Sequence, residues 1–289
     1  MAATHDSYYL PNPSRWPITG SIGLFFLLGG FAMLLNESPL GKWAMIIGAV
    51  IVVHMLFGWF GTVIRESEKG SYNEQVDVSF RWGMGWFIFS EVLFFAAFFG
   101  ALFYIRILSV PWLGGEGAGG AATGPVLWPG FDAVWPTNGP GDIGGAFETI
   151  PALGLPAINT LLLLSSGVTV TIAHHALKQG NRRGLCTWLF ATIVLGVTFL
   201  GVQAYEFYHA YTDLNLSLGS GAYGSTFFML TGFHGLHVTI GAIMLTVIFA
   251  RSLSGHFTPS HHFGFEAVAW YWHFVDVVWL GLFIFVYWL

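Results

Sequence analysis

The sequence predicts an all-α, polytopic membrane protein with seven transmembrane helices. Hydrophobic residues make up 55% of the chain and charged residues only 9%, against about 25% charged residues in an ordinary soluble domain. The mean hydropathy of +0.66 agrees with this composition. Apolar runs recur along the chain, and each is long enough to cross a hydrocarbon core of about 30 Å as a helix. A soluble protein is therefore excluded.

The predicted helices follow these runs, at residues 18–35, 43–64, 82–108, 150–177, 185–211, 223–250 and 265–289. We expect a single membrane domain over 1–289, with a two-helix bundle over 18–64, a cytoplasmic linker over 65–81 and a five-helix bundle over 82–289. Residues 1–16 are polar and no small-residue cleavage site follows the first run, so we expect no cleavable signal peptide.

The basic residues predict the orientation of the chain. With seven crossings, one side of the membrane receives Arg15, Arg65, Lys69, Arg81, Lys178, Arg182, Arg183 and Arg251, and the other receives Lys42 and Arg106. The positive-inside rule then places the N-terminus in the cytoplasm and the C-terminus outside.

The outer loop over residues 109–149 is rich in glycine and proline and carries the acids Glu116, Asp132, Asp142 and Glu148. This composition predicts a flexible loop, held against the membrane surface or a neighbour by Trp112, Trp128 and Trp135. A second interpretation is that its acidic residues attract a basic soluble partner. The single cysteine, Cys186, excludes an intrachain disulfide and a CxxC metal or redox site. The chain has no basic patch for nucleic acid.

Glu91 is the main candidate for a functional side chain within the membrane. It follows Arg81 by ten residues, which places it about 15 Å into the third helix, near the bilayer midplane. Phenylalanines surround it at helical spacing, so its carboxyl group is poorly solvated. It is either a proton-exchanging or partner-facing acid, or a neutral acid hydrogen-bonded between helices.

Other ionisable residues recur within the predicted spans, namely His54, Glu206, His209, His234, His237, His273 and Asp276. Bis-histidine haem ligation is one interpretation, but nothing in the sequence fixes the required geometry. The Glu206-x-x-His209 spacing is also used in di-iron bundles, which repeat it on a second helix; this chain has no second copy. The favoured interpretation is structural, with these side chains hydrogen-bonded between helices because lipid offers them no partner.

Histidines also gather at the predicted cytoplasmic ends of the fourth, sixth and seventh helices, as His174, His175, His256, His261 and His262, together with Glu266. Groups that titrate near neutrality at a membrane surface can collect protons. A solvated interfacial rim is the alternative.

Several long motifs in order give the chain a resemblance to a known family. They are SRWPITGS, VIRES, FIFSEVLFF, LSSGVTVTIAHH, QAYEF, YGSTFFMLTGFHGLHV and HHFGFEAVAWYWHFVDVVWL. They resemble subunit III of the haem–copper cytochrome c oxidases, and the resemblance extends over nearly the whole chain. The chain looks like a bacterial member of that family. The outer loop over 109–149 departs from the family because it is longer and richer in glycine than in mitochondrial members.

The resemblance implies a non-catalytic core subunit of a proton-pumping oxidase that passes electrons from cytochrome c to oxygen. It implies no haem, copper or other metal in this chain, with those groups in partner subunits I and II. It also implies that helices one and two lean away from helices three to seven, leaving a V-shaped cleft filled with phospholipid against subunit I. Such subunits support proton uptake by subunit I and protect its oxygen-reducing site during turnover.

The resemblance assigns roles to residues at matching positions. Glu91 matches the family's intramembrane glutamate, while Arg65, Glu66, Arg251 and His237 match residues near the bound lipid. Independently of the resemblance, His174, His175, His261 and His262 are the candidates for collecting protons on the cytoplasmic side. His234, His273, Asp276 and Glu206 are expected to be structural.

Four other functions are alternatives to this one. A transporter would show internal repeats or matching broken helices, and the sequence has neither. An accessory subunit of a quinol oxidase or nitric oxide reductase is disfavoured because the first two helices are intact. A seven-helix receptor or a self-sufficient cytochrome remains open, and a haem spectrum of the isolated chain would identify the latter. The expected location is the bacterial inner membrane.

Overall fold

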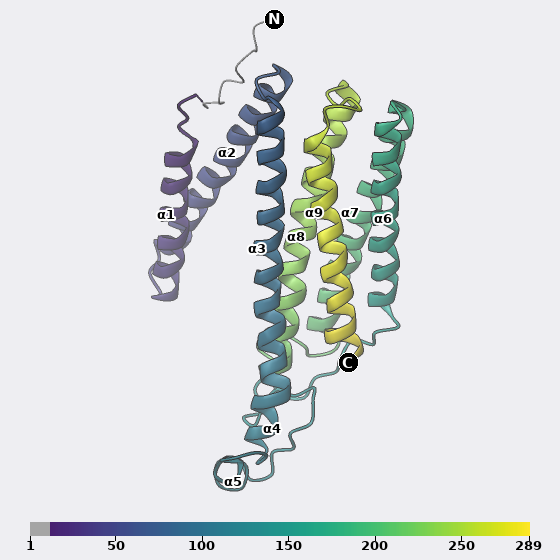
Figure 1. The fold of residues 1–289 in the computed structure, drawn as a ribbon. Helices are drawn as coiled ribbons and strands as arrows, with labels where there is room; N and C mark the ends of the chain where they lie inside the picture. The colour runs from purple at the N-terminus through teal and green to yellow at the C-terminus, as the bar shows by residue number, and fades with distance from the viewer. Residues whose placement is uncertain (1–11) are drawn as a thin grey trace, which may run out of the picture. The chain divides into compact units, whose positions relative to one another are not determined.

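The computed structural model describes residues 12–289, and these residues form helices and loops without a strand. Residues 1–11 belong to the segment predicted to lack a signal peptide and to face the cytoplasm, and they lie outside the described residues. Seven segments are long and apolar enough to span a membrane. Their helices are α1 (Trp16–Leu35), α2 (Gly41–Glu68), α3 (Glu74–Phe103), α6 (Leu155–Lys178), α7 (Arg182–Thr212), α8 (Gly221–Ser254) and α9 (Phe263–Leu282) (Figure 1).

The predicted count and order of spans are confirmed, with two informative differences at their ends. The fourth helix begins at Leu155 rather than at residue 150, because Pro151 precedes it and Pro156 occupies its first turn. The polar segment over 65–81 is mostly helical, since α2 continues to Glu68 and α3 already begins at Glu74. Asn73 caps the start of α3 by accepting a hydrogen bond from the Val76 N–H.

The chain divides into two compact units, which are described separately; the first ends at Phe80. In that unit α1 packs against α2 through glycines, and the buried residues of these two helices are Gly20, Gly23, Gly30, Gly41 and Gly48. A methyl group at Gly48 would lie 2.3 Å from the backbone nitrogen of Leu27. The two backbones therefore approach as closely as only glycine permits.

The second unit runs from Arg81 to Leu289 and contains most of α3 together with α6, α7, α8 and α9 (Figure 1). Its core is aromatic, and Trp272 and Trp279 of α9 are fully buried. Each indole N–H has a partner on α6: Trp272 donates to Ser166 Oγ (2.8 Å) and Trp279 to Thr160 Oγ1 (2.9 Å). These two bonds fix the position of α9 against α6.

The outer loop contains helical turns and contacts the first turn of α8. The turns are η1 (Tyr104–Ser109), α4 (Val110–Leu113), α5 (Gly120–Ala122) and η2 (Thr123–Leu127); a further turn, η3 (Phe283–Trp288), continues α9. Trp135 and Phe147 both pack on Tyr223, and the Tyr223 N–H donates to the Thr137 carbonyl. Asn215 also donates to the carbonyls of Gly144 and Ala146. The loop is thus anchored to its own unit, and its attachment to a membrane surface through Trp112 and Trp128 stays a prediction.

Candidate functional site

Glu91 of α3 and His237 of α8 form a direct polar contact inside the second unit, with Glu91 Oε2 2.8 Å from His237 Nε2. The other ring nitrogen of His237 lies 2.6 Å from the Phe233 carbonyl. Because a carbonyl oxygen can only accept, Nδ1 carries a proton and donates it. The remaining contact then shares one proton, as a carboxylic acid beside imidazole or a carboxylate beside imidazolium. In either form the pair is neutral overall.

Aromatic side chains surround the Glu91–His237 pair and leave little of either side chain exposed. The side chains of Glu91 and His237 are only 21% and 11% exposed. The rings of Phe94 and Phe95 lie 5.7 Å and 4.9 Å from the His237 ring, and Tyr271 donates its hydroxyl proton to the His237 carbonyl. The sequence singled out both residues but assigned them different roles, because spacing along one helix does not reveal a contact across two.

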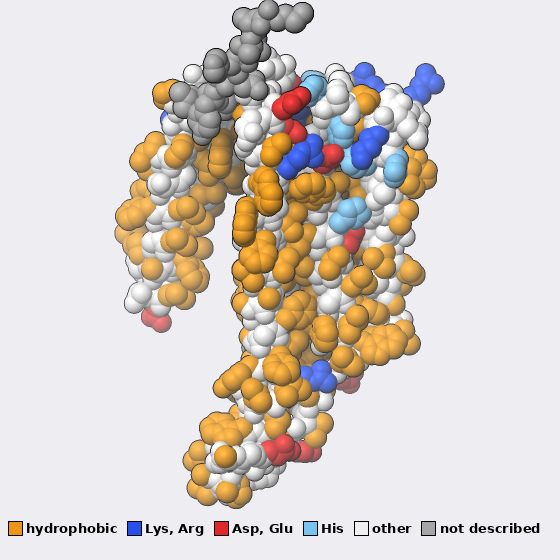
Figure 2. Space-filling model, in the orientation of Figure 1, with side chains coloured by type: hydrophobic (Ala, Val, Ile, Leu, Met, Phe, Trp, Pro, Cys, Tyr) orange, Lys and Arg blue, Asp and Glu red, His pale blue; other side chains and the backbone are white. Residues whose placement is uncertain are grey.

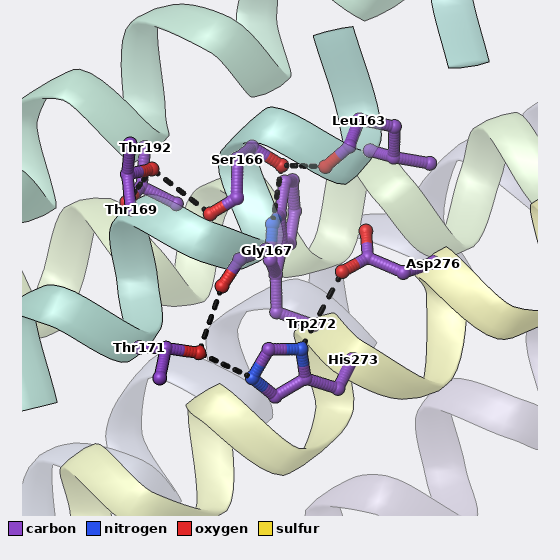
Figure 3. Close-up of polar contacts among 9 residues, drawn as sticks. All are labelled: Leu163, Ser166, Gly167, Thr169, Thr171, Thr192, Trp272, His273 and Asp276. Carbon is purple, nitrogen blue, oxygen red and sulfur yellow. Dashed lines mark hydrogen bonds and ion pairs between the residues drawn. The ribbon is translucent and has the colours of Figure 1, made fainter. Parts of the chain in front are cut away.

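A second polar link joins α9 to α6, between His273, Asp276 and Thr171 (Figure 3). Thr171 donates its hydroxyl proton to the Gly167 carbonyl, so it accepts from His273 Nε2 at 3.2 Å. His273 Nδ1 lies 3.5 Å from the Asp276 carboxylate, whose side chain is 8% exposed. A methyl group at Gly167 would lie 2.4 Å from Asp276 Oδ2, so a larger residue there would displace the carboxylate. A structural role for His273 and Asp276 stays a prediction.

Glu206 and His234 are completely buried. Glu206 Oε1 accepts from Tyr287 at 2.5 Å and from Gln203 at 3.2 Å, which links α7 to η3. His209, three residues on, instead contacts Asp213 at 2.6 Å. His234 is enclosed by the rings of Phe199 and Trp279. None of these contacts resembles a paired di-iron motif.

Charged and histidine side chains gather at one end of the second unit, where α3 and α9 begin and α6 ends (Figure 2). Arg81 of α3 forms an ion pair with Glu266 of α9. The second carboxylate oxygen of Glu266 lies 3.3 Å from His262 Nε2 and 3.8 Å from His174 Nε2. His175 and His261 are exposed to the outside of this cluster. The four predicted histidines therefore divide into an inner pair and an outer pair, and proton collection by them stays a prediction.

Three of the four predicted lipid-contacting residues, Arg65, Glu66 and Arg251, lie near helix ends. In the first unit Arg65 is exposed in the last turn of α2 and donates to Thr62, while Glu66 accepts from Tyr72 at 2.8 Å. In the second unit Arg251 lies in the last turn of α8, with its guanidinium 4.5 Å above the ring of Phe257. His237 contacts Glu91 within the helical core. Lipid binding at these residues stays a prediction.

Comparisons with known proteins agree with the motifs. A family model described as cytochrome c oxidase subunit III matches residues 5–119 and 125–289. A protein of Equus caballus named cytochrome c oxidase subunit 3 is 42% identical over 99% of this chain and 98% of its own length. Proteins with the same name from Nanger granti and Dugong dugon are 42% and 41% identical over the same shares. None of these relatives tests a bacterial source, which stays a prediction.

Proposed function

This chain belongs to the cytochrome c oxidase subunit III family, and from that premise we propose that it is a non-catalytic core subunit that stabilises the oxidase during turnover. The observation that carries the proposal is the contact between Glu91 of α3 and His237 of α8. A neutral, aromatic-enclosed pair is suited to locking two helices together. In this role the contact stiffens the surface that subunit I meets, near the point where subunit I takes up protons.

The redox groups are proposed to lie in partner subunits I and II, with cytochrome c as the electron donor to the complex. Support comes from the intramembrane histidines of the second unit. His237 is engaged with Glu91, and His273 with Thr171 and Asp276. His234 is packed between aromatic rings. Because these imidazoles are packed or bonded to protein groups, the arrangement favours a structural subunit over a haem-binding cytochrome. The relatives are named cytochrome c oxidase subunit 3, which also favours cytochrome c over a quinol as the electron donor.

Phospholipid binding is proposed at Arg65 in the first unit and Arg251 in the second. Both arginines lie in the last turn of a membrane helix, which is where lipid headgroups are found. A guanidinium forms bidentate, charge-assisted hydrogen bonds with phosphate, so arginine suits this position better than lysine. Replacement of Arg251 by Lys keeps the charge and should still reduce the amount of phospholipid that co-purifies.

The proposed location is the bacterial inner membrane, with the N-terminus in the cytoplasm. The uneven division of Lys and Arg between the two sides of the membrane supports this orientation. Cysteine labelling of each terminus in intact cells would test it directly.

The experiment that tests the proposed function is purification of the tagged chain from its native membrane in mild detergent. We expect it to bring down larger subunits with a haem spectrum, and to separate as a colourless chain when a harsher detergent is applied. A chain that purifies alone and retains a haem spectrum would contradict the proposal.

A further inference from the structure

We propose that His174, His262 and Glu266 form a binding site for one divalent transition-metal ion of the Zn²⁺ type. One ligand atom from each residue, the two Nε2 atoms and a carboxylate oxygen, lies within 4.8 Å of the other two. The three residues come from the end of α6, the residue before α9 and the first turn of α9. The proposal concerns these side chains alone and does not depend on the oxidase role.

One nitrogen atom of each imidazole is buried and makes no hydrogen bond within the part of the chain that the structure describes. Among the described residues, neither His174 Nε2 nor His262 Nε2 has a hydrogen-bond partner, although both atoms are buried. The His262 side chain is 9% exposed. Its Nδ1 lies 3.1 Å from the Thr258 carbonyl, and since a carbonyl only accepts, Nδ1 must carry the proton. In neutral His262 the Nε2 atom therefore points a lone pair into the cluster, as a metal ligand does.

Glu266 completes the donor set and is itself held in place. Its Oε1 faces His262 Nε2 at 3.3 Å and His174 Nε2 at 3.8 Å. Its Oε2 is ion-paired with Arg81, whose guanidinium lies over the ring of Phe263. Metal-binding carboxylates are commonly oriented by such an outer partner. The ion pair leaves one oxygen directed at the two imidazoles.

The geometry and the ligand types select the kind of ion. Two ligand atoms about 2.1 Å from a tetrahedral Zn²⁺ ion lie roughly 3.4 Å apart, which is close to both observed separations. Two imidazole nitrogens with one carboxylate oxygen suit Zn²⁺, whereas Mg²⁺ and Ca²⁺ prefer oxygen ligands throughout. Three protein ligands leave the fourth position for water. A bound ion would tie the end of α6 to the start of α9.

The chain supplies its own matched controls, because each cluster histidine has an exposed neighbour. The variants His174→Gln and His262→Gln remove a ligand, while His175→Gln and His261→Gln remove an adjacent histidine outside the cluster. The full chain without a polyhistidine tag would be placed in lipid nanodiscs and titrated with Co²⁺, read by its visible absorption, and then with competing Zn²⁺.

We expect wild type and both control variants to bind one ion with a tetrahedral Co²⁺ spectrum. Both cluster variants should bind at least about tenfold more weakly, since even outer partners of a metal ligand contribute about 10–100-fold in affinity. Equal binding by all four variants, or equal loss in the controls, would overturn the proposal.

A second measurement needs no variant and therefore does not depend on whether one folds. X-ray absorption at the zinc edge of the Zn²⁺-loaded wild-type chain should show two imidazole ligands and oxygen ligands at about 2.0–2.1 Å. An all-oxygen shell, or a shell with a single imidazole, would contradict the site.

Discussion

The α1–α2 pair and the bundle of α3 and α6–α9 show two different ways of packing helices in a membrane. The buried residues of α1 and α2 are glycines, and large side chains such as Phe25 face outward, 73% exposed. In the bundle the buried residues include Phe199, Trp272 and Trp279, and the two indole N–H groups donate hydrogen bonds to side chains of α6.

Lipid is as apolar as the side chains, so apolar character alone does not select which helices pack together. The comparison shows two other sources of that selectivity. The α1–α2 pair depends on close backbone approach, which a single methyl group can prevent. The bundle depends on filled volume and on polar groups that must find each other. We therefore expect the pair to be sensitive to added volume and the bundle to be sensitive to a lost polar partner.

The largest expected effect is from added volume at Gly48. Gly48→Val would place a side chain where a Cβ alone lies 2.3 Å from the Leu27 nitrogen. We expect a loss of about 3 kcal/mol in the stability of the α1–α2 pair, at the upper end of typical overpacking effects. Hydrogen exchange of the α1 and α2 amides measures it. Gly29→Val is the control, because a Cβ at Gly29 meets no atom within 4 Å; comparable opening in both variants would refute close backbone packing.

A lost partner at Glu91 should have the next largest effect. Glu91→Leu removes the group that faces His237 Nε2 at 2.8 Å. We expect destabilisation of about 2 kcal/mol, within the range for hydrogen bonds that involve charged groups. The midpoint of unfolding in sodium dodecyl sulphate gives the value. Glu91→Gln should retain most of the stability, because an amide can donate to the unprotonated Nε2. A double-mutant cycle with His237→Phe that shows no coupling would mean that the contact is energetically silent.

A smaller effect is expected at Ser166. Ser166→Ala removes the acceptor of the Trp272 indole N–H, which is then buried without a partner. The expected loss is about 1 kcal/mol. It can be measured by the same unfolding midpoint. Ser90→Ala is the control, since Ser90 is exposed and bonds only within its own helix, to the Phe87 carbonyl. Equal midpoints for the two variants would show that the Trp272 bond contributes nothing.

Hydropathy was sufficient to predict the seven spans, because hydrocarbon thickness sets their length and lipid requires helical backbone. It could not predict that α2 and α3 extend into the polar segment from its two ends, since charged residues allow either a helix or a loop beyond the membrane. The start of α6 at Leu155 was also missed, because Pro151 and Pro156 interrupt a run that hydropathy alone treats as continuous.

The candidate site was predictable as a set of residues but not as a set of contacts. Glu91 and His237 are both identified from the sequence, yet their contact joins residues 146 positions apart in the chain. The division of the histidine cluster into an inner pair, His174 and His262, and an outer pair, His175 and His261, likewise depends on how α6 and α9 face each other. Neighbouring residues on one chain segment carry no signal that separates them.

The most direct test of the central claim is the lifetime of the oxidase under continuous turnover, compared between the wild-type complex and Glu91→Leu. We expect the variant complex to keep this chain, its haem spectrum and its initial rate, but to lose activity after fewer turnovers. Glu91→Gln should fall between the two. An intact Glu91→Leu complex with the wild-type turnover lifetime would contradict the claim that the Glu91–His237 contact stabilises the oxidase at work.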